Sequence, residues 1–366
     1  THLFEQPSAC AFSNSKHWEL LQNQHAFPLS VIVAITEKCN YSCPHCYIED
    51  RSPSALHMNP DLAIDLLEQL EEAGTLSVTF SGGEPTLHTN LLTFVREAVK
   101  RHFWVKLKSN GSNLSRDSLD QLKAAGLSVL DISLYHISAD KHDSFVGVPG
   151  AWKNAVQALT YFNKIGGKAR ASIIGLDMNT HSLSKLLDVL ERQGIGFSAD
   201  LRIVPKSSDD HSNCAVSVKE EDLVHILRDQ RIWKPNTTAS KQRVRQGALC
   251  NAGRSLAYFR PNGDVLLCPS IEIAIGNVAE ARFVDIWQDS VFKNQFRSMR
   301  WEDTEVCSSC NLQHLCSRCP ANAYLYHSSF LAVSPPDCAL ARAKAKIIED
   351  DKASKGDSFR LKKAPR

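Results

Sequence analysis

Short apolar runs alternate with amphipathic segments over much of this chain, and this alternation restricts its fold more than any other feature. Six runs have the length and composition of buried strands: Ser30–Thr36, Ser77–Phe80, Trp104–Ser109, Val129–Leu134, Ala169–Gly175 and Ala199–Val204. Strands that alternate with helical patterns form parallel βα units, and a closed barrel needs eight of them. We therefore predict an α/β fold with an open, partial (β/α)6 TIM-like barrel, whose chemistry lies at the carboxyl ends of its parallel strands.

The segments between these runs begin with residues that cap helices and end near glycines. Four helices are predicted from these signals: Asn59–Gly74, Ser115–Gly126, Thr180–Gly194 and Ser217–Gln230. The fourth is expected to open with a capping box formed by Ser217 and Glu220.

The pattern changes after residue 247. Tyr258–Val265 is typical of a β-hairpin with the turn Asn262-Gly263, Phe283–Met299 is predicted to be helical, and a dense run of cysteines follows. We therefore divide the chain into an N-terminal segment (1–28), the partial barrel (29–230), a linker (231–247), a small cysteine-rich domain with a hairpin and helices (248–345) and a solvated basic tail (346–366).

Composition excludes several classes of protein. The 366 residues are 43% hydrophobic and carry a net charge of +2, which argues against electrostatically driven binding to nucleic acid. No apolar run approaches the roughly 18–20 residues that cross a bilayer. The first residues also lack the pattern of a secretory signal. We expect a cytoplasmic protein with neither nucleic-acid nor membrane partners.

The chain has 12 cysteines, and most are clustered, which indicates metal ligands rather than disulfides in a reducing compartment. Cys39, Cys43 and Cys46 follow the first predicted strand, separated by three and then two residues. Three thiolates in one loop can hold three corners of a cubane iron–sulfur cluster and leave the fourth iron open to a ligand. The alternative is a zinc knuckle that uses His45 as its fourth ligand.

The second predicted strand runs into Gly82-Gly83-Glu84-Pro85. Two glycines let the backbone approach a ligand closely, and Glu84 can accept hydrogen bonds from an amino group. Together with the cysteine triplet, this strand end resembles the radical S-adenosylmethionine (SAM) enzymes, and the resemblance covers nearly the whole chain. It implies a [4Fe-4S] cluster on Cys39, Cys43 and Cys46, with the SAM amino and carboxylate groups on its open iron.

The same resemblance implies further SAM contacts. The segment Gly82–Pro85 would hold the methionine amino group, while Ser109, Asn110 and Ser133 would contact the ribose and the carboxylate. One position departs from the family, since Val146 stands where several relatives carry an arginine. Arg170 and Arg202 are therefore candidates to neutralise the SAM carboxylate, although Arg170 falls at the wrong end of its predicted strand.

Seven further cysteines follow in the second half of the chain, too many for one tetrahedral site: Cys250, Cys268, Cys307, Cys310, Cys316, Cys319 and Cys338. Their spacing resembles a SPASM domain, which houses two auxiliary iron–sulfur clusters, each expected to be [4Fe-4S]. The resemblance implies that Cys250, Cys268 and Cys319 bind the cluster nearer the barrel, and that the other four cysteines bind the distal one. A pair of zinc ribbons is the structural alternative.

Two cysteines, Cys10 and Cys214, have no place in these sets. Either could supply the missing fourth ligand of the nearer auxiliary cluster, which could also be open or capped by another group. Isolated cysteines are, however, more often small buried hydrophobic residues.

Family resemblance implies that an electron enters the first cluster and that SAM is cleaved to a 5′-deoxyadenosyl radical, which takes hydrogen from a substrate. The segments Ile132–Tyr135, His142–Trp152 and Ile275–Trp287 are similar to SPASM enzymes that modify ribosomally made precursor peptides. We expect such a peptide as substrate, a C-C or C-S cross-link as product and an electron donor such as flavodoxin or ferredoxin. Because few residues precede the first strand, a separate peptide-recognition protein is a possible partner.

Other reactions compete with cross-linking. An anaerobic sulfatase-maturing enzyme, which forms formylglycine, would carry an acid–base aspartate after Cys268, where this chain has Pro269. A peptide epimerase would need a thiol, Cys214 or Cys10, to return hydrogen. Outside catalysis, the competing hypothesis is a zinc-organised binding protein. Catalytic residues other than the cofactor ligands are not predicted.

Overall fold

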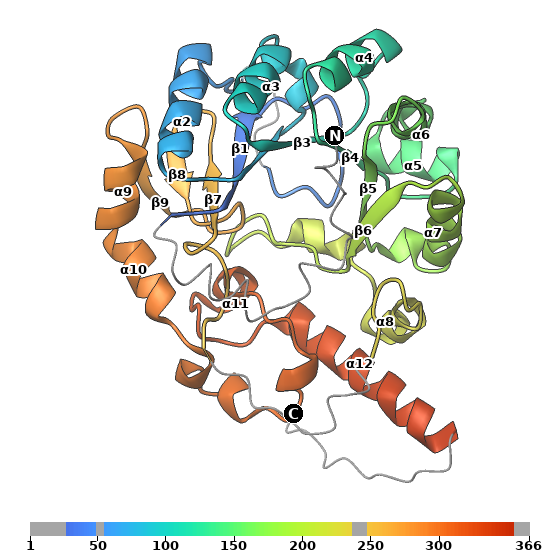
Figure 1. Cartoon of the computed structure of the whole chain (residues 1–366). Helices are drawn as coiled ribbons and strands as arrows, with labels where there is room; N and C mark the ends of the chain where they lie inside the picture. Colours follow the sequence, from blue (N-terminus) through green and yellow to red (C-terminus); the bar gives the residue numbers. More distant parts are fainter. Residues whose placement is uncertain (1–26, 49–54, 236–246, 355–366) are drawn as a thin grey trace, which may run out of the picture.

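The computed structural model describes residues 27–48, 55–235 and 247–354 (Figure 1). Six parallel strands form the predicted open barrel, in the order β6-β5-β4-β3-β2-β1. Their bounds are β1 (Ser30–Thr36), β2 (Ser77–Gly82), β3 (Trp104–Ser109), β4 (Val129–Ser133), β5 (Ala169–Ile174) and β6 (Gly196–Asp200). The predicted fold class is confirmed, and all six carboxyl ends meet at one edge of the sheet.

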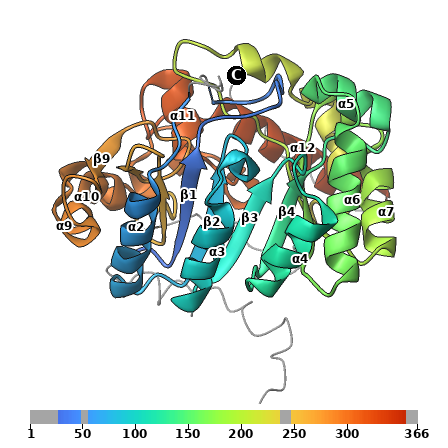
Figure 2. The same ribbon diagram turned by 90° about the horizontal axis from the view of Figure 1, so that it is seen from above.

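Helices connect the strands and cover one side of the sheet, as Figure 2 shows for α2, α3, α4 and α6. The helices of this part are α2 (Pro60–Glu72), α3 (Leu91–Lys100), α4 (Arg116–Ala124), α5 (Ala139–Val146), α6 (Ala151–Lys164), α7 (Leu183–Arg192) and α8 (Glu220–Leu227). Asn59 caps α2 by accepting from the backbone of Asp61 at 2.8 Å, and Ser115 caps α4 by accepting from Ser118 at 3.1 Å. Both caps were predicted.

The core lies between the sheet and these helices. Val31, Val33 and Phe80 of the strands are almost fully buried, as are Leu66 of α2 and Phe94 of α3. Burial of each such side chain contributes about 1.5–3 kcal/mol. This packing fixes the strands and therefore the positions of the loops at their carboxyl ends.

The sheet continues into the second half of the chain. Strands β7 (Leu256–Phe259), β8 (Asp264–Leu266) and β9 (Ala274–Asn277) follow β1, so the whole sheet has nine strands. β7 pairs in parallel with β1, from Ser30 opposite Leu256 to Val33 opposite Phe259. The β7–β8 hairpin and its turn were predicted, but its hydrogen bonding to the barrel was not, because the partner strands are far apart in sequence.

The remaining helices are α9 (Phe283–Asp289), α10 (Val291–Ser298), α11 (Pro320–His327) and α12 (Pro335–Ser354). Figures 1 and 2 agree in placing α11 and α12 on the side of the sheet away from α2, α3 and α4. Among the described residues, no helix combines the length and hydropathy that a bilayer crossing requires.

The last barrel strand was predicted in the wrong place. β6 covers Gly196–Asp200, rather than Ala199–Val204, because these residues pair with β5. The Asp200 carboxylate then accepts from the backbone of Arg202 at 3.0 Å and turns the chain. Ile203 is buried in a loop against Tyr41 and Tyr135. Its apolar character therefore reflects packing outside the sheet.

Three helix boundaries also differ from the prediction. Thr180 does not cap α7, since its hydroxyl donates to the carbonyl of Leu176. Ser217 does not open α8, which begins at Glu220: Ser217 forms an isolated bridge with Leu176, and Glu220, its predicted partner, is paired with Arg342. Phe283–Met299 forms two helices, because the Ser290 side chain accepts from Lys293 and begins α10.

The tail beginning at residue 346 was predicted to be solvated, but α12 continues to Ser354. Helix α12 packs on α8, and Ile347 on it is only 4% exposed. Arg228, the residue that directly follows α8, forms an ion pair with Asp350 at 2.6 Å. These contacts order a segment whose composition alone favours solvent. The first 26 residues, most of the linker and residues 355–366 lie outside the described part of the chain.

Candidate active site

The loop that carries Cys39, Cys43 and Cys46 leaves β1 at Thr36 and presses on the end of β2. The backbone of Gly83 donates to the carbonyl of Thr36 at 2.8 Å, and that of Glu84 donates to Lys38 at 2.7 Å. A Cβ on Gly82 (φ +136°) would lie 2.0 Å from the Thr36 oxygen, and one on Gly83 would lie 2.2 Å from the Lys38 oxygen. Both glycines therefore make room for the cysteine loop, and their predicted contact with a ligand stays a prediction.

Glu84 is fully buried, and its carboxylate joins the ends of β2 and β3. One oxygen accepts from Ser109 Oγ at 2.7 Å and from both the backbone and the hydroxyl of Thr86, while the other accepts from the Asn110 backbone at 2.7 Å. Burial raises the pKa of Glu84, and these hydrogen bonds oppose that shift. All four donors come from this chain; one oxygen accepts three of these hydrogen bonds and the other accepts only one, so the second oxygen can still accept from an amino group.

Asn110 connects the end of β3 to the cysteine loop. Its side-chain amide donates to Oδ1 of Asn40 at 2.9 Å, and Asn40 in turn donates to Ser112 Oγ at 2.8 Å. Asn40 lies between Cys39 and Cys43 but carried no signal in the sequence, since its partners are 70 and 72 residues away.

Two further contacts hold the other side of the cysteine loop. The backbone of Ser42 donates to the carbonyl of Val146 at 3.1 Å, and Asn213 Nδ2 donates to the carbonyl of His45 at 3.2 Å. The Val146 side chain is fully buried, so the position where several relatives have arginine carries an apolar contact here. Asn213 was missed in the sequence because its partner is 168 residues away.

The remaining predicted SAM contacts lie at different places. Ser133 ends β4 opposite Ser172, at the same edge of the sheet as the cysteine loop. Arg170 is the second residue of β5 and therefore lies at the far end of the strand. Arg202 lies near the site edge but is paired with Asp200 at 3.0 Å and with Asp337 at 3.3 Å.

The seven later cysteines influence one another's pKa values in two groups. Burial is the largest of the causes that raise the pKa of Cys268 to about 12, with smaller contributions from the charges of Cys250 and Cys319. Burial is also the largest of the causes that raise the pKa of Cys316 to about 12, followed by the charges of Asp337, Cys338 and Cys307. Cys310 contributes in the same way to the pKa values of Cys307 and Cys338, and the division of these thiols between two clusters stays a prediction.

Tyr47 directly follows Cys46 in the first cysteine loop. Burial raises its pKa, with smaller contributions from Tyr258, Cys46 and Cys268. Cys268 follows β8 of the sheet, and Cys250, Cys268 and Cys319 pack against the main hydrophobic core.

Sets of three or four cysteine thiols are the donors that iron–sulfur clusters take, one thiolate to each iron corner. Within residues 27–48, 55–235 and 247–354, no three His, Cys, Asp or Glu side chains converge closely enough to hold one metal ion. His45, the fourth ligand of the zinc alternative, packs its ring against Tyr135 at 4.9 Å and Phe145 at 5.4 Å.

Cys214 lies beside this site, whereas Cys10 falls outside the described residues. Cys214 belongs to the short helix η3 (Ser212–Val216) and packs in the same apolar cluster as Cys39 and Cys43. The Tyr326 hydroxyl of α11 donates to its sulfur at 3.8 Å. Burial raises the pKa of Cys214, so it is a protonated thiol at neutral pH.

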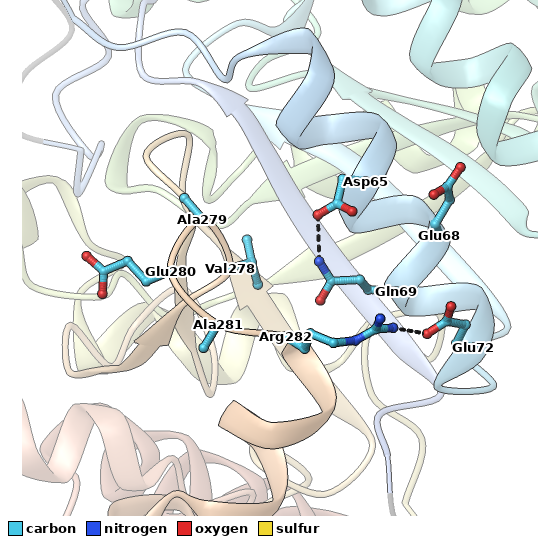
Figure 3. A pocket seen from close by; sticks show the side chains of 9 residues that line it. All are labelled: Asp65, Glu68, Gln69, Glu72, Val278, Ala279, Glu280, Ala281 and Arg282. Atoms are coloured by element: carbon cyan, nitrogen blue, oxygen red, sulfur yellow. Dashed lines mark hydrogen bonds and ion pairs between the residues drawn. The ribbon is translucent and has the colours of Figure 1, made fainter.

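A polar cleft of about 320 Å³ separates α2 from the turn before α9, well away from the cysteine loops. Gln69 bridges it, accepting from the Phe283 backbone and donating to Asp65, each at 2.6 Å, and Arg282 pairs with Glu72 (Figure 3). These contacts fasten the second half of the chain to the barrel and provide no cluster ligands.

Family models decide the assignment. A model of the radical SAM superfamily matches residues 33–191, and one of an iron-sulfur cluster-binding domain, SPASM, matches residues 250–311. The chain belongs to the radical SAM superfamily and carries a SPASM domain. This radical SAM enzyme therefore uses SAM, a [4Fe-4S] cluster and auxiliary iron–sulfur clusters, and the hypothesis of a zinc-organised binding protein is set aside. The SPASM match ends before Cys316, Cys319 and Cys338, so their role as ligands stays a prediction.

Similar proteins span most of this radical SAM chain. The AdoMet-dependent heme synthase of Nitratidesulfovibrio vulgaris is 23% identical over 82% of this chain and 89% of the relative. The PqqA peptide cyclase of Bradyrhizobium diazoefficiens is 26% identical over 91% of this chain and 92% of the relative. The crystal structure of Streptococcus suis SuiB bound to precursor peptide SuiA has a TM-score of 0.70 and 18% identity, covering 89% of this chain and 79% of that one, which supports the fold.

Part of the motif that suggested a peptide substrate has a structural role. The Asp143 carboxylate accepts from the backbones of Gly150 at 2.6 Å and Trp152 at 2.7 Å, and so caps α6. His142 is buried and accepts from the Tyr135 backbone at 3.2 Å. Trp287 is fully buried in the core. These residues shape the radical SAM barrel and its junction with the SPASM domain.

Proposed function

We propose that this enzyme abstracts hydrogen from a ribosomally made precursor peptide and forms a C-C or C-S cross-link in it. The observation that carries the proposal is the match to a peptide cyclase along 91% of this chain. The fold shared with a protein crystallised on its precursor peptide is consistent with it.

In this proposal, the residue sets keep the roles implied by the family. Cys39, Cys43 and Cys46 hold the [4Fe-4S] cluster. The SAM contacts are Gly82, Gly83, Glu84, Pro85, Ser109, Asn110 and Ser133. The auxiliary clusters are held by Cys250, Cys268 and Cys319 and by Cys307, Cys310, Cys316 and Cys338.

When bound, these groups supply the radical chemistry that removes a hydrogen atom from an unactivated C–H bond and accepts a further electron. A cross-link removes two hydrogens from the peptide, so an electron acceptor is required in addition to SAM. The chain's own residues orient these groups, since Glu84 and Asn110 tie the cysteine loop to β2 and β3.

The test uses anaerobically reconstituted protein, SAM, a reductant and a short peptide encoded next to its gene. We expect release of 5′-deoxyadenosine and loss of about two hydrogens from the peptide, with about twelve irons per chain. The Cys43→Ala variant is the matched control and should leave the peptide unchanged. Because some relatives make heme, a parallel reaction contains a heme precursor; turnover there, with an unchanged peptide, would contradict the proposal.

The proposal includes a flavodoxin or ferredoxin as the electron donor, a cytoplasmic location and, where the peptide leader is not bound by this chain, a separate recognition protein. A pull-down of the peptide by purified enzyme alone tests the last point. Binding with micromolar affinity would make the separate protein unnecessary.

Epimerisation is the second candidate, and the position of Cys214 favours it. A protonated thiol that packs against the cluster loop and accepts from Tyr326 is placed to return a hydrogen atom to a peptide radical. In deuterated solvent an epimerase would leave one deuterium in a peptide that otherwise keeps its mass. Loss of that label in Cys214→Ala, with full iron content, would establish epimerisation in place of cross-linking.

A further inference from the structure

Asp337 is a buried carboxylate that lies between the two groups of SPASM cysteines. Its side chain is 1% exposed. One oxygen accepts from the backbone of Cys319 at 2.8 Å and from Ser334 Oγ at 2.5 Å. The other accepts from Arg202 Nη1 at 3.3 Å. Asp337 also directly precedes Cys338 in α12, so it contacts one auxiliary site through Cys319 and adjoins the other.

The charge of Asp337 acts on both groups. Asp337 accepts from the Cys319 backbone at 2.8 Å and directly precedes Cys338, so its carboxylate lies beside one cysteine of each set. Reduction of a cluster adds one negative charge to it. A fixed negative charge beside the cluster therefore disfavours its reduction.

Arg202 supplies the opposite charge from the barrel. It follows β6, is 28% exposed and is fixed by Asp200 at 3.0 Å and by the carbonyl of Ser317 at 3.3 Å. Its Nη1 reaches the Ser317 carbonyl and Asp337, each at 3.3 Å, two residues before Cys319 and one residue before Cys338 respectively. The pair therefore places a negative and a positive charge beside the nearer auxiliary site.

We propose that Asp337 and Arg202 set the reduction potentials of the auxiliary clusters in opposite directions, with Asp337 lowering them and Arg202 raising that of the nearer cluster. Charges and hydrogen bonds close to a cluster tune its potential, and their effect is large where water is excluded. The inference depends on the cysteine assignment proposed above but not on the identity of the substrate.

The experiment is a redox titration of the reconstituted full-length enzyme without substrate, followed by electron paramagnetic resonance. At the wild-type midpoint potential, Asp337→Asn should raise the ratio of reduced to oxidised auxiliary cluster about tenfold, which is about 59 mV for one electron. Arg202→Gln should lower that ratio for the nearer cluster. Ser334→Ala removes a hydrogen bond to Asp337 but no charge, so it is the matched control and should leave both ratios within about twofold.

If the two residues act through their charges, Asp337→Asn and Arg202→Gln shift the ratio of reduced to oxidised cluster in opposite directions. If the two residues only support the structure, both variants shift that ratio in the same direction. Shifts of equal sign, unchanged ratios at full iron content, or an equal shift in Ser334→Ala would each overturn the inference. If Asp337→Asn loses iron, Asp337→Glu replaces it in the test. Because Asp337→Glu retains the negative charge, it must keep the wild-type ratio of reduced to oxidised cluster. Arg202→Gln must still lower that ratio for the nearer cluster.

A second measurement separates this inference from the cysteine assignment. A variant with Cys39, Cys43 and Cys46 all changed to alanine should retain about eight irons, whose signals identify the auxiliary clusters in the titration. Absence of iron in that variant would contradict the assignment itself.

Discussion

Asn110 and Asn40 are joined by a 2.9 Å hydrogen bond between their side chains, although 70 residues separate them. The bond connects the end of β3 to the middle of the loop that carries the cysteine triplet. The same loop is held by the carbonyl of Val146 and by Asn213. The loop therefore owes its position to three elements of the barrel, in addition to its own sequence.

The first prediction separates the two roles of Asn110. Asn110→Ala should weaken SAM binding about tenfold, or about 1.4 kcal/mol, because Asn110 is also a proposed SAM contact. Asn40→Ala breaks the same hydrogen bond and should change SAM affinity by less than about threefold. Calorimetric titration with SAM checks both, and equal losses in the two variants would show that Asn110 acts only by holding the loop.

The second prediction concerns the close contact between the cysteine loop and β2. Gly83→Ala should displace the loop, because its Cβ would lie 2.2 Å from the Lys38 carbonyl, and should remove about four of roughly twelve irons. Gly166→Ala is the control. Gly166 also has a positive φ, +76°, but an added Cβ there meets no atom within 4 Å. This variant should keep its iron and lower the free energy of unfolding by only about 1 kcal/mol. Iron analysis and absorption spectra measure the result; full iron content in Gly83→Ala would contradict it.

The third prediction is a pH dependence that arises from His142. Burial lowers the pKa of His142 to about 4, so the folded state prefers neutral imidazole. Its contribution to stability is present above the unfolded pKa of 6.5 and is lost as the pH falls toward 4. Between pH 7.5 and 5.5, the free energy of unfolding should fall by roughly 1 kcal/mol from this residue. Urea unfolding at the two pH values measures this decrease. His142→Gln should lack it, whereas His181→Gln, which changes an exposed histidine, should retain it.

The fourth prediction tests the corrected boundary of the second domain. Ile347→Ala should destabilise the protein by about 2–4 kcal/mol, because it leaves a cavity at a buried position of α12. Lys346→Ala, on the exposed side of the same helix, should stay within about 0.5 kcal/mol. Denaturant unfolding compares the two, and equal midpoints would mean that α12 does not support α8.

Local patterns were enough to place β1 and β3, the caps at Asn59 and Ser115 and the Asn262-Gly263 turn, because each depends on neighbours in the chain. The cysteine spacing and the Gly-Gly-Glu-Pro segment were likewise enough to point to the family. β6 and the start of α8 were misplaced where a distant partner decided the outcome: β5 set the register of β6, and Arg342 engaged Glu220.

The amino-acid order alone therefore contained the fold class and the set of candidate ligands. Folding in three dimensions decided that β7 extends the barrel sheet, that Glu84 serves the chain's own donors, and that Asp337 faces Arg202. The reason is physical: propensities and spacings act over a few residues, whereas a buried polar group or an unpaired strand edge is satisfied by whichever partner packing brings within about 3 Å.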